Sequence, residues 1–323
     1  MSPRFLLPLI FLLPAPASAP DGRGVAPSSF DEVRRRITPQ ALAALVAGPI
    51  ALADSGDLAA AEAEFEQLRH QATFRHGKGS VETHDLLTAF ALGLYGSRVV
   101  TIATALSADE APQVASPDPR KALALSVFRR AAIEARGAFG PDHIETSLAL
   151  YTLAEALLPS GNLAEREEVS PEEAVKALEE AYAIAAARFG TRHRDTNILL
   201  ALLAEAKSHP SRIAGARGRL QEVSGLYRLV IANLPAEAGE PDPLEVRTAW
   251  IGFLVRHDQI AEAEEVVADA RRRDHGFRFA DGGTLLCGGE YNLAVAAAHQ
   301  LDLAGHREAG ARMRARYGDR GCG

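Results

Sequence analysis

The 323-residue sequence predicts an all-α fold, an α-solenoid of antiparallel helix pairs stacked one after another. Three observations support this prediction. Alanine and leucine dominate and aromatic residues make up only 6%, and both of the abundant residues have high helix propensity. Alternating runs of Val, Ile and Thr are nearly absent, which argues against a sheet-based fold. The third observation is a motif that recurs at regular spacing.

This motif repeats a glycine, a histidine and a threonine at the same offsets, in FGPDHIET at 139–146 and FGTRHRDT at 189–196. Two weaker copies are HGKGSVET at 76–83 and GEPDPLEV at 239–246. The three later copies start at 139, 189 and 239, a spacing of 50 residues each time. A fixed period of this kind indicates a repeat architecture.

Each motif lies between two segments with helical apolar periodicity. In the segments upstream, an alanine is followed by a large apolar residue four positions later and by a third apolar residue seven positions later. The triples are Ala61–Phe65–Leu68, Ala124–Phe128–Ala131 and Ala174–Leu178–Ala181. Offsets of four and seven place these residues on one helix face, where alanines let a neighbouring helix approach closely. The segments downstream, such as SLALYTLAEALL and NILLALLAEAKS, complete a helix–loop–helix unit.

The motif itself suits a joint between two helices. Gly140 and Gly190 suit the end of the preceding helix, where a left-handed conformation is common. Pro141 and Asp142 suit the start of the next helix. The φ angle of proline matches that of a first helical turn, and the aspartate carboxylate accepts hydrogen bonds from the free backbone N–H groups there.

A metal or catalytic site made from His143, His193 and Asp142 is the alternative. Equivalent loops of stacked helix pairs lie about 18–20 Å apart, from two helix spacings of roughly 8–10 Å. Zinc needs ligands within about 2.0–2.2 Å of one ion, so the two motifs cannot share it. We therefore expect structural joints at Gly140, His143, Thr146, Gly190, His193 and Thr196, and no metal site.

The N-terminus has the layout of a secretory signal peptide over residues 1–19. Arg4 precedes an apolar run at 5–13, and small residues end at Ala19. The run is too short to span a bilayer, so we expect no membrane span after signal removal. Pro20 is a poor context for cleavage after Ala19, which leaves the exact cut open. The alternative is an unstructured apolar tail. We expect export to a periplasmic or extracellular compartment. Residues 20–38, which follow the signal peptide in the sequence, are expected to form a linker.

The remaining organisation follows from composition. Residues 39–318 form the repeat domain, with insertion loops near 107–119 and 159–171, which are rich in proline and small or polar residues. Residues 274–289 are glycine-rich and are expected to be irregular. A final helix pair is expected at about 290–303 and 306–317, before a tail at 319–323.

These motifs resemble tetratricopeptide repeat (TPR) proteins, specifically the longer repeats of the kinesin-light-chain type, over about residues 40–318. That family joins repeats through a Leu-Gly-x-x-His-x-x-Thr loop, followed by a Leu-Ala pair, a glycine turn and an Ala-x-x-x-large-x-x-Ala helix. The matching residues are Gly140, His143, Thr146, Leu153, Ala154, Gly161, Ala174, Leu178, Ala181, Gly190, His193, Thr196, Leu203 and Ala204. The resemblance implies an α-solenoid of about five to six repeats that binds proteins or peptides. The unit here is longer than the family's, and Tyr151–Thr152 and Ala201–Leu202 replace the paired asparagines that often line the family's groove.

In such solenoids the first helix of each pair lines the concave side, and its exposed positions contact partners. Phe90, Leu153 and Leu203 set the register. The candidate groove residues are then Asp85, Thr88, Tyr95, Tyr151, Glu155, Glu205 and His209. This acidic and moderately aromatic set suits a basic or amphipathic peptide. The alternative is that these are ordinary solvated or packing positions.

Charge and cysteine content bear on the function class. The net charge is −7 and the basic residues are scattered, unlike the clustered positive face of a nucleic-acid binder. Cys287 and Cys322 are expected to form a disulfide if the protein is exported; two free thiols are the alternative. We expect a non-catalytic, cofactor-free scaffold or adaptor that binds a protein or peptide. The alternatives are a thiol-dependent enzyme centred on Cys287 and a self-associating repeat protein.

Overall fold

The computed structural model describes residues 29–30, 40–96, 119–158, 171–208, 217–233, 243–273 and 289–317. Within these ranges the regular structure consists of twelve helices, so the predicted all-α class is confirmed. None of the helices described is both long enough and apolar enough to cross a bilayer. The signal peptide, most of both insertion loops and the C-terminal tail lie outside the described residues.

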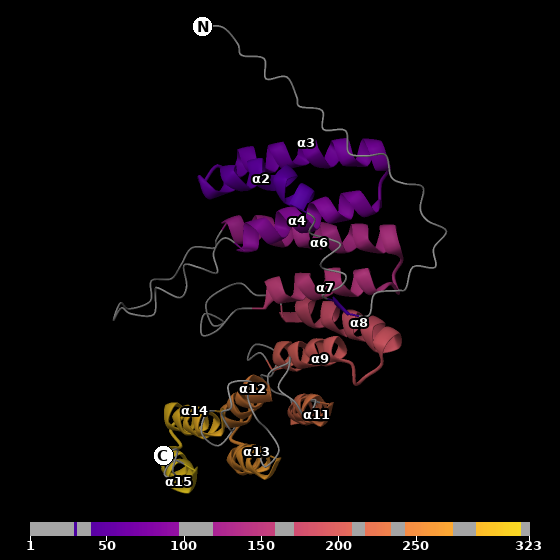
Figure 1. Ribbon diagram of the computed structural model, residues 1–323. Coiled ribbons are helices and arrows are strands. Elements are labelled where there is room, and N and C mark those ends of the chain that lie inside the picture. Colours follow the sequence, from indigo (N-terminus) through magenta and orange to yellow (C-terminus); the bar gives the residue numbers. More distant parts are fainter. Residues whose placement is uncertain are drawn as a thin grey trace.

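The twelve helices pack as six consecutive pairs (Figure 1). The first helices of the pairs are α2 (Gln40–Asp54), α4 (Val81–Gly96), α7 (Ile144–Leu157), α9 (Arg194–Lys207), α12 (Pro243–Arg256) and α14 (Gly289–Leu303). The second helices are α3 (Leu58–His76), α6 (Pro119–Phe139), α8 (Pro171–Phe189), α11 (Arg217–Asn233), α13 (Ile260–Arg273) and α15 (Arg307–Tyr317). The expected final pair is thus confirmed as α14 and α15.

The order of the pairs in space follows their order in the chain. Each second helix contacts its own first helix, and each one before α15 also contacts the first helix of the next pair. Among the first helices, α2 packs extensively on α4 and α12 packs extensively on α14. In Figure 1, α3 to α9 form a column of rods seen from the side, whereas α11, α13 and α15 are seen nearly end on. The helix direction therefore changes along the stack.

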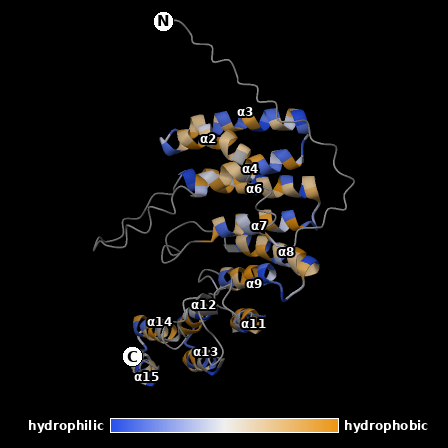
Figure 2. Cartoon of the chain, in the orientation of Figure 1, coloured by the Kyte–Doolittle hydropathy of each residue, from blue (hydrophilic) through white to orange (hydrophobic). Residues whose placement is uncertain are grey.

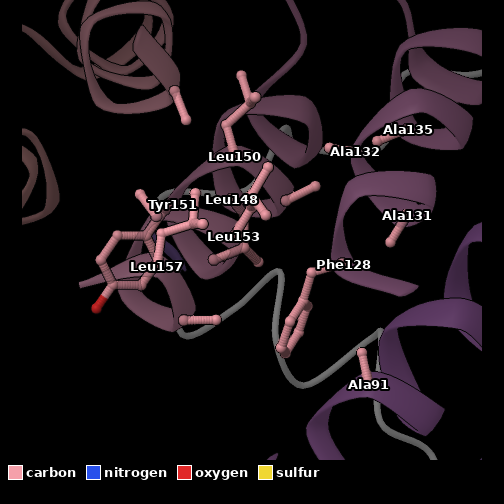
Figure 3. Close-up of a cluster of buried hydrophobic side chains, with 14 of the residues drawn as sticks. Ala91, Phe128, Ala131, Ala132, Ala135, Leu148, Leu150, Tyr151, Leu153 and Leu157 are labelled. Atoms are coloured by element: carbon pink, nitrogen blue, oxygen red, sulfur yellow. The ribbon is translucent and has the colours of Figure 1, made fainter. Parts of the chain in front are cut away.

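Alanines bring the helices together at the positions that the sequence predicts. Ala124 and Ala131 of α6 and Ala174 and Ala181 of α8 are buried, as are the large residues between them. Figure 3 shows Phe128 and the alanines of α6 lying between Ala91 of α4 and the leucines of α7. Hydrophobic residues recur at intervals along each helix instead of filling its length (Figure 2), which is the pattern of a helix buried on part of its surface.

The buried residues form two hydrophobic clusters that share α9. Leu199 and Leu203 belong to the cluster that extends back to α2, whereas Leu200 and Ala204 belong to the cluster that extends forward to α15. These residues point to different sides of one helix, so α9 contributes fully buried residues to both clusters. Tyr182 of α8 and Leu226 of α11 are partly buried and also pack against both.

Ion pairs connect the second helices of neighbouring pairs. They link α3 to α6, α6 to α8, α11 to α13 and α13 to α15, through Glu66–Arg130, Arg129–Glu173, Arg136–Glu180, Arg228–Glu262 and Glu264–Arg312. The Arg136–Glu180 contact is bidentate, with Nη2 at 2.8 and 2.7 Å from the two carboxylate oxygens. Exposed ion pairs each contribute about 0–1 kcal/mol to stability. Their main effect is therefore to favour one alignment of each second helix along its neighbour.

The short turns inside three pairs share one geometry. In each, a backbone N–H donates to the carbonyl five residues earlier, and the residue before it has positive φ. The bonds are Asp57 to Leu52, Gln259 to Leu254 and His306 to Leu301, at 3.0, 2.9 and 2.8 Å. The positive φ values are 91° at Gly56, 56° at Asp258 and 88° at Gly305. The third turn shows that the last pair repeats the same unit as the earlier ones.

Candidate functional site

The first joint, between α6 and α7, is built around His143. Gly140 follows α6 with a φ of 96°, and its carbonyl accepts the hydroxyl of Thr146 at 2.7 Å. His143 is the N-cap of α7, and its Nδ1 accepts the backbone N–H of Glu145 at 3.4 Å. The imidazole also stacks on Phe139, with ring centroids 5.5 Å apart. The histidine therefore caps one helix while packing on the end of the previous one.

The second joint, between α8 and α9, has the same arrangement. Gly190 has a φ of 90°, and Nδ1 of His193 accepts the backbone N–H of Asp195 at 3.2 Å. The imidazole stacks on Phe189 at 4.5 Å. Thr196 is buried, and its hydroxyl has no hydrogen-bond partner among the described residues. The glycine and the histidine thus play the same structural part in both joints.

One detail of the expected joint is wrong. Pro141 and Asp142 do not begin the next helix but lie in the turn, and the histidine after them is the cap. An imidazole nitrogen with a free lone pair accepts an amide N–H as a carboxylate oxygen does, so the histidine takes the role that sequence preferences assign to Asp142. Within the described ranges, no group of three or more His, Cys, Asp and Glu side chains is placed to hold a metal ion.

The candidate groove residues on α4 differ in environment. Asp85 is half-buried, and burial followed by the charges of Glu145 and Glu82 raises the pKa of Asp85 to about 7. Its Oδ1 has no hydrogen-bond partner among the described residues. Thr88 is buried. Tyr95 packs edge-on against Phe128 of its own pair, with centroids 6.1 Å apart.

The candidates on α7 lie together. The hydroxyl of Tyr151 donates to the carboxylate of Glu155, one turn further along the helix. Figure 3 shows the Tyr151 ring at the edge of the hydrophobic cluster with its hydroxyl pointing away from it. Glu155 is half-buried, and Glu205 on α9 is exposed. His209, Cys287 and Cys322 lie outside the described residues.

Phe30, from the segment expected to be a linker, packs beside Tyr151. Its side chain is only 3% exposed. Its ring stacks on Tyr151 with centroids 5.7 Å apart and meets Phe189 edge-on at 6.3 Å. Its backbone N–H donates to Oδ2 of Asp195 at 2.5 Å. We call the side chains of Tyr151, Phe189 and Asp195 the Phe30 site.

Sequence reasoning identified Tyr151 but missed the other members of this site. Asp195 lies in the motif itself, at an offset where all four copies have an acidic residue (Glu82, Glu145, Asp195 and Glu245), but the expected joint included only the glycine, the histidine and the threonine. Phe30 is the only aromatic residue between 20 and 39. A single aromatic residue in a polar segment is the one signal in the sequence that could have drawn attention to it.

Comparison with known proteins gives no assignment of family or function, so any functional argument depends on the residues of this chain. No protein-family model matches the sequence, and no curated protein matches it significantly.

Proposed function

We propose that this protein is a non-catalytic scaffold or adaptor that binds a protein or peptide segment after export from the cytoplasm. We further propose that the six helix pairs form a TPR-type solenoid, with the first helices lining the binding surface. The partner-binding face comprises the exposed and half-buried side chains of α4, α7 and α9, which we call the first-helix face.

The observation that supports this proposal best is a set of carboxylates on the first helices α4, α7 and α9. Asp85, Glu155 and Glu205 are half-buried or exposed there, and none of the ion pairs that link the second helices to one another involves them. A face with this charge attracts a positively charged segment and raises its association rate.

Selection from a random peptide display library tests the proposal. The full chain is compared with a Glu155→Lys/Glu205→Lys variant, which reverses two charges on the first-helix face. The matched control is Glu62→Lys/Glu308→Lys, which reverses two exposed charges on the second helices α3 and α15 and has the same net charge.

We expect the wild-type chain to enrich basic peptides, and their binding to weaken as salt is raised because exposed charges are screened beyond about 8–10 Å. The first-helix variant should bind these peptides at least ~10-fold more weakly, about 1.4 kcal/mol. The control should bind them within about twofold of wild type. Equal loss in both variants would assign the effect to net charge and contradict the proposed face.

A further inference from the structure

Phe30 reaches its site from far away in the chain. It precedes the first helix of the first pair, yet it contacts α7, α9 and the end of α8, in the third and fourth pairs. The partners of its backbone hydrogen bond are 165 residues apart. Phe30 therefore packs on helices of the third and fourth pairs, although it precedes the first pair in the sequence.

The Phe30 site contacts two separate features of the residue that it holds. Tyr151 and Phe189 contact the flat aromatic ring, and Asp195 accepts the N–H of the same residue. The Asp195 side chain is itself buried, at 2% exposure of the residue, so a donor arriving there meets a carboxylate shielded from water. Any extended segment with an aromatic residue offers this combination, because every non-proline residue has its own backbone N–H.

Two of the contacts come from first helices. Tyr151 is in α7 and Asp195 is near the start of α9, so the Phe30 site adjoins the proposed first-helix face. After Phe30 the sequence continues with Asp31 and Glu32 and then with Arg34, Arg35 and Arg36, so residues 30–36 carry a net charge of +1. The chain's own N-terminal segment thus combines an aromatic residue with a cluster of three arginines that an acidic face attracts.

We propose that Tyr151, Phe189 and Asp195 form the subsite that recognises an aromatic residue of an extended protein segment, and that Phe30 occupies this subsite in cis. A partner then binds by displacing Phe30. This inference rests on the proposed function, since it names one chemical feature of the partner and the internal competitor for the same face.

The tether sets how strongly Phe30 competes. Nine residues, 31–39, separate Phe30 from the start of α2. Linkers of a few residues that span two sites give effective concentrations of about 1 mM. If the Phe30 segment binds with a Kd of about 0.1 mM, a competing segment would therefore bind with an apparent affinity roughly tenfold lower.

Binding of the chain's own segment, supplied as a separate peptide, tests the proposal. The probe is a fluorescein-labelled peptide of residues 26–36, APSSFDEVRRR, measured by fluorescence anisotropy. It is titrated with the wild-type chain, with Phe30→Ala, and with Phe74→Ala, which removes a phenylalanine that is 92% exposed on α3. A second peptide has alanine in place of the phenylalanine.

We expect the Phe30→Ala chain to bind the probe about ten times more tightly than the wild-type and Phe74→Ala chains do. The alanine peptide should not bind. Asp195→Asn in the Phe30→Ala chain should lower the affinity for the probe at least ~10-fold, because a charged hydrogen-bond acceptor is lost.

Three results would overturn the inference. Equal affinity of the wild-type and Phe30→Ala chains would show that Phe30 does not compete. A Phe30→Ala chain that unfolds, or that folds but does not bind the probe, would assign Phe30 to the permanent core. Basic peptides from the library selection that bind the wild-type and Phe30→Ala chains equally would overturn this inference alone and leave the proposed function in place.

Discussion

Replacing Asp85 by asparagine should stabilise the protein at alkaline pH and have much less effect in acid. The pKa of Asp85 is raised to about 7 by its burial on α4 and by the charges of Glu145 and Glu82. A folded-state pKa above the unfolded-state value means that the native state binds the proton more tightly. The resulting stability is fully present below about pH 4 and is lost as the pH rises through about 7.

The magnitude follows from the size of that shift. About three pKa units at ~1.4 kcal/mol each give a total of ~4 kcal/mol, of which roughly 2.5 kcal/mol falls between pH 5 and pH 8. Solvent contact at the half-buried carboxyl reduces this figure, and we expect a change of about 1–2 kcal/mol. Asparagine keeps the size of the side chain and has no charge, so Asp85→Asn removes this pH dependence.

Urea unfolding followed by circular dichroism at 222 nm measures the effect. The quantity of interest is the unfolding free energy of Asp85→Asn minus that of the wild type, compared at pH 5 and pH 8. The difference should be more positive at pH 8 by about 1–2 kcal/mol. Asp142→Asn, at an exposed turn position, serves as the control. A difference that is the same at both pH values, within about 0.5 kcal/mol, would refute the reasoning.

Three further substitutions test the packing, the joints and the ion pairs. Ala181→Leu adds atoms at a fully buried position of α8 and should lower the unfolding free energy by about 1–3 kcal/mol. Ala183→Leu, at an exposed position of the same helix, should change the unfolding free energy little. Urea denaturation measures both values. His143→Ala removes the N-cap of α7 and should cost about 1 kcal/mol, and His143→Asn should restore most of it; equal loss in both would contradict a capping role. Arg136→Ala removes a half-exposed ion pair with Glu180 and should cost less than about 1 kcal/mol; a larger drop in melting temperature than for His143→Ala would show that the ion pairs do more than favour a register.

The joints could be predicted because their signals are local. A glycine, a capping residue and a threonine at fixed offsets determine a turn with little help from the rest of the chain. The twofold use of Gly140 and Gly190 with positive φ follows directly from such a signal. The identity of the cap was missed only because histidine is an uncommon choice at that position.

The binding-site residues were harder to predict because they depend on contacts across the stack. Tyr95 lies on the helix predicted to face a partner, but a small rotation about the helix axis decides that its ring packs on Phe128 instead. The pKa of Asp85 is raised first by burial and then by the charge of Glu145, which belongs to a different helix pair. Phe30 reaches Asp195 across 165 positions, and no periodicity connects two residues at that separation.

The position of α9 in both hydrophobic clusters has a consequence for how the chain opens. Amide protons exchange with solvent through partial unfolding, and segments that open separately exchange at separate rates. We expect helices α2 to α7 to open while the forward cluster persists, and helices α12 to α15 to open while the other cluster persists. Complete exposure of α9 requires both clusters to come apart, so its central amides should exchange among the slowest in the protein.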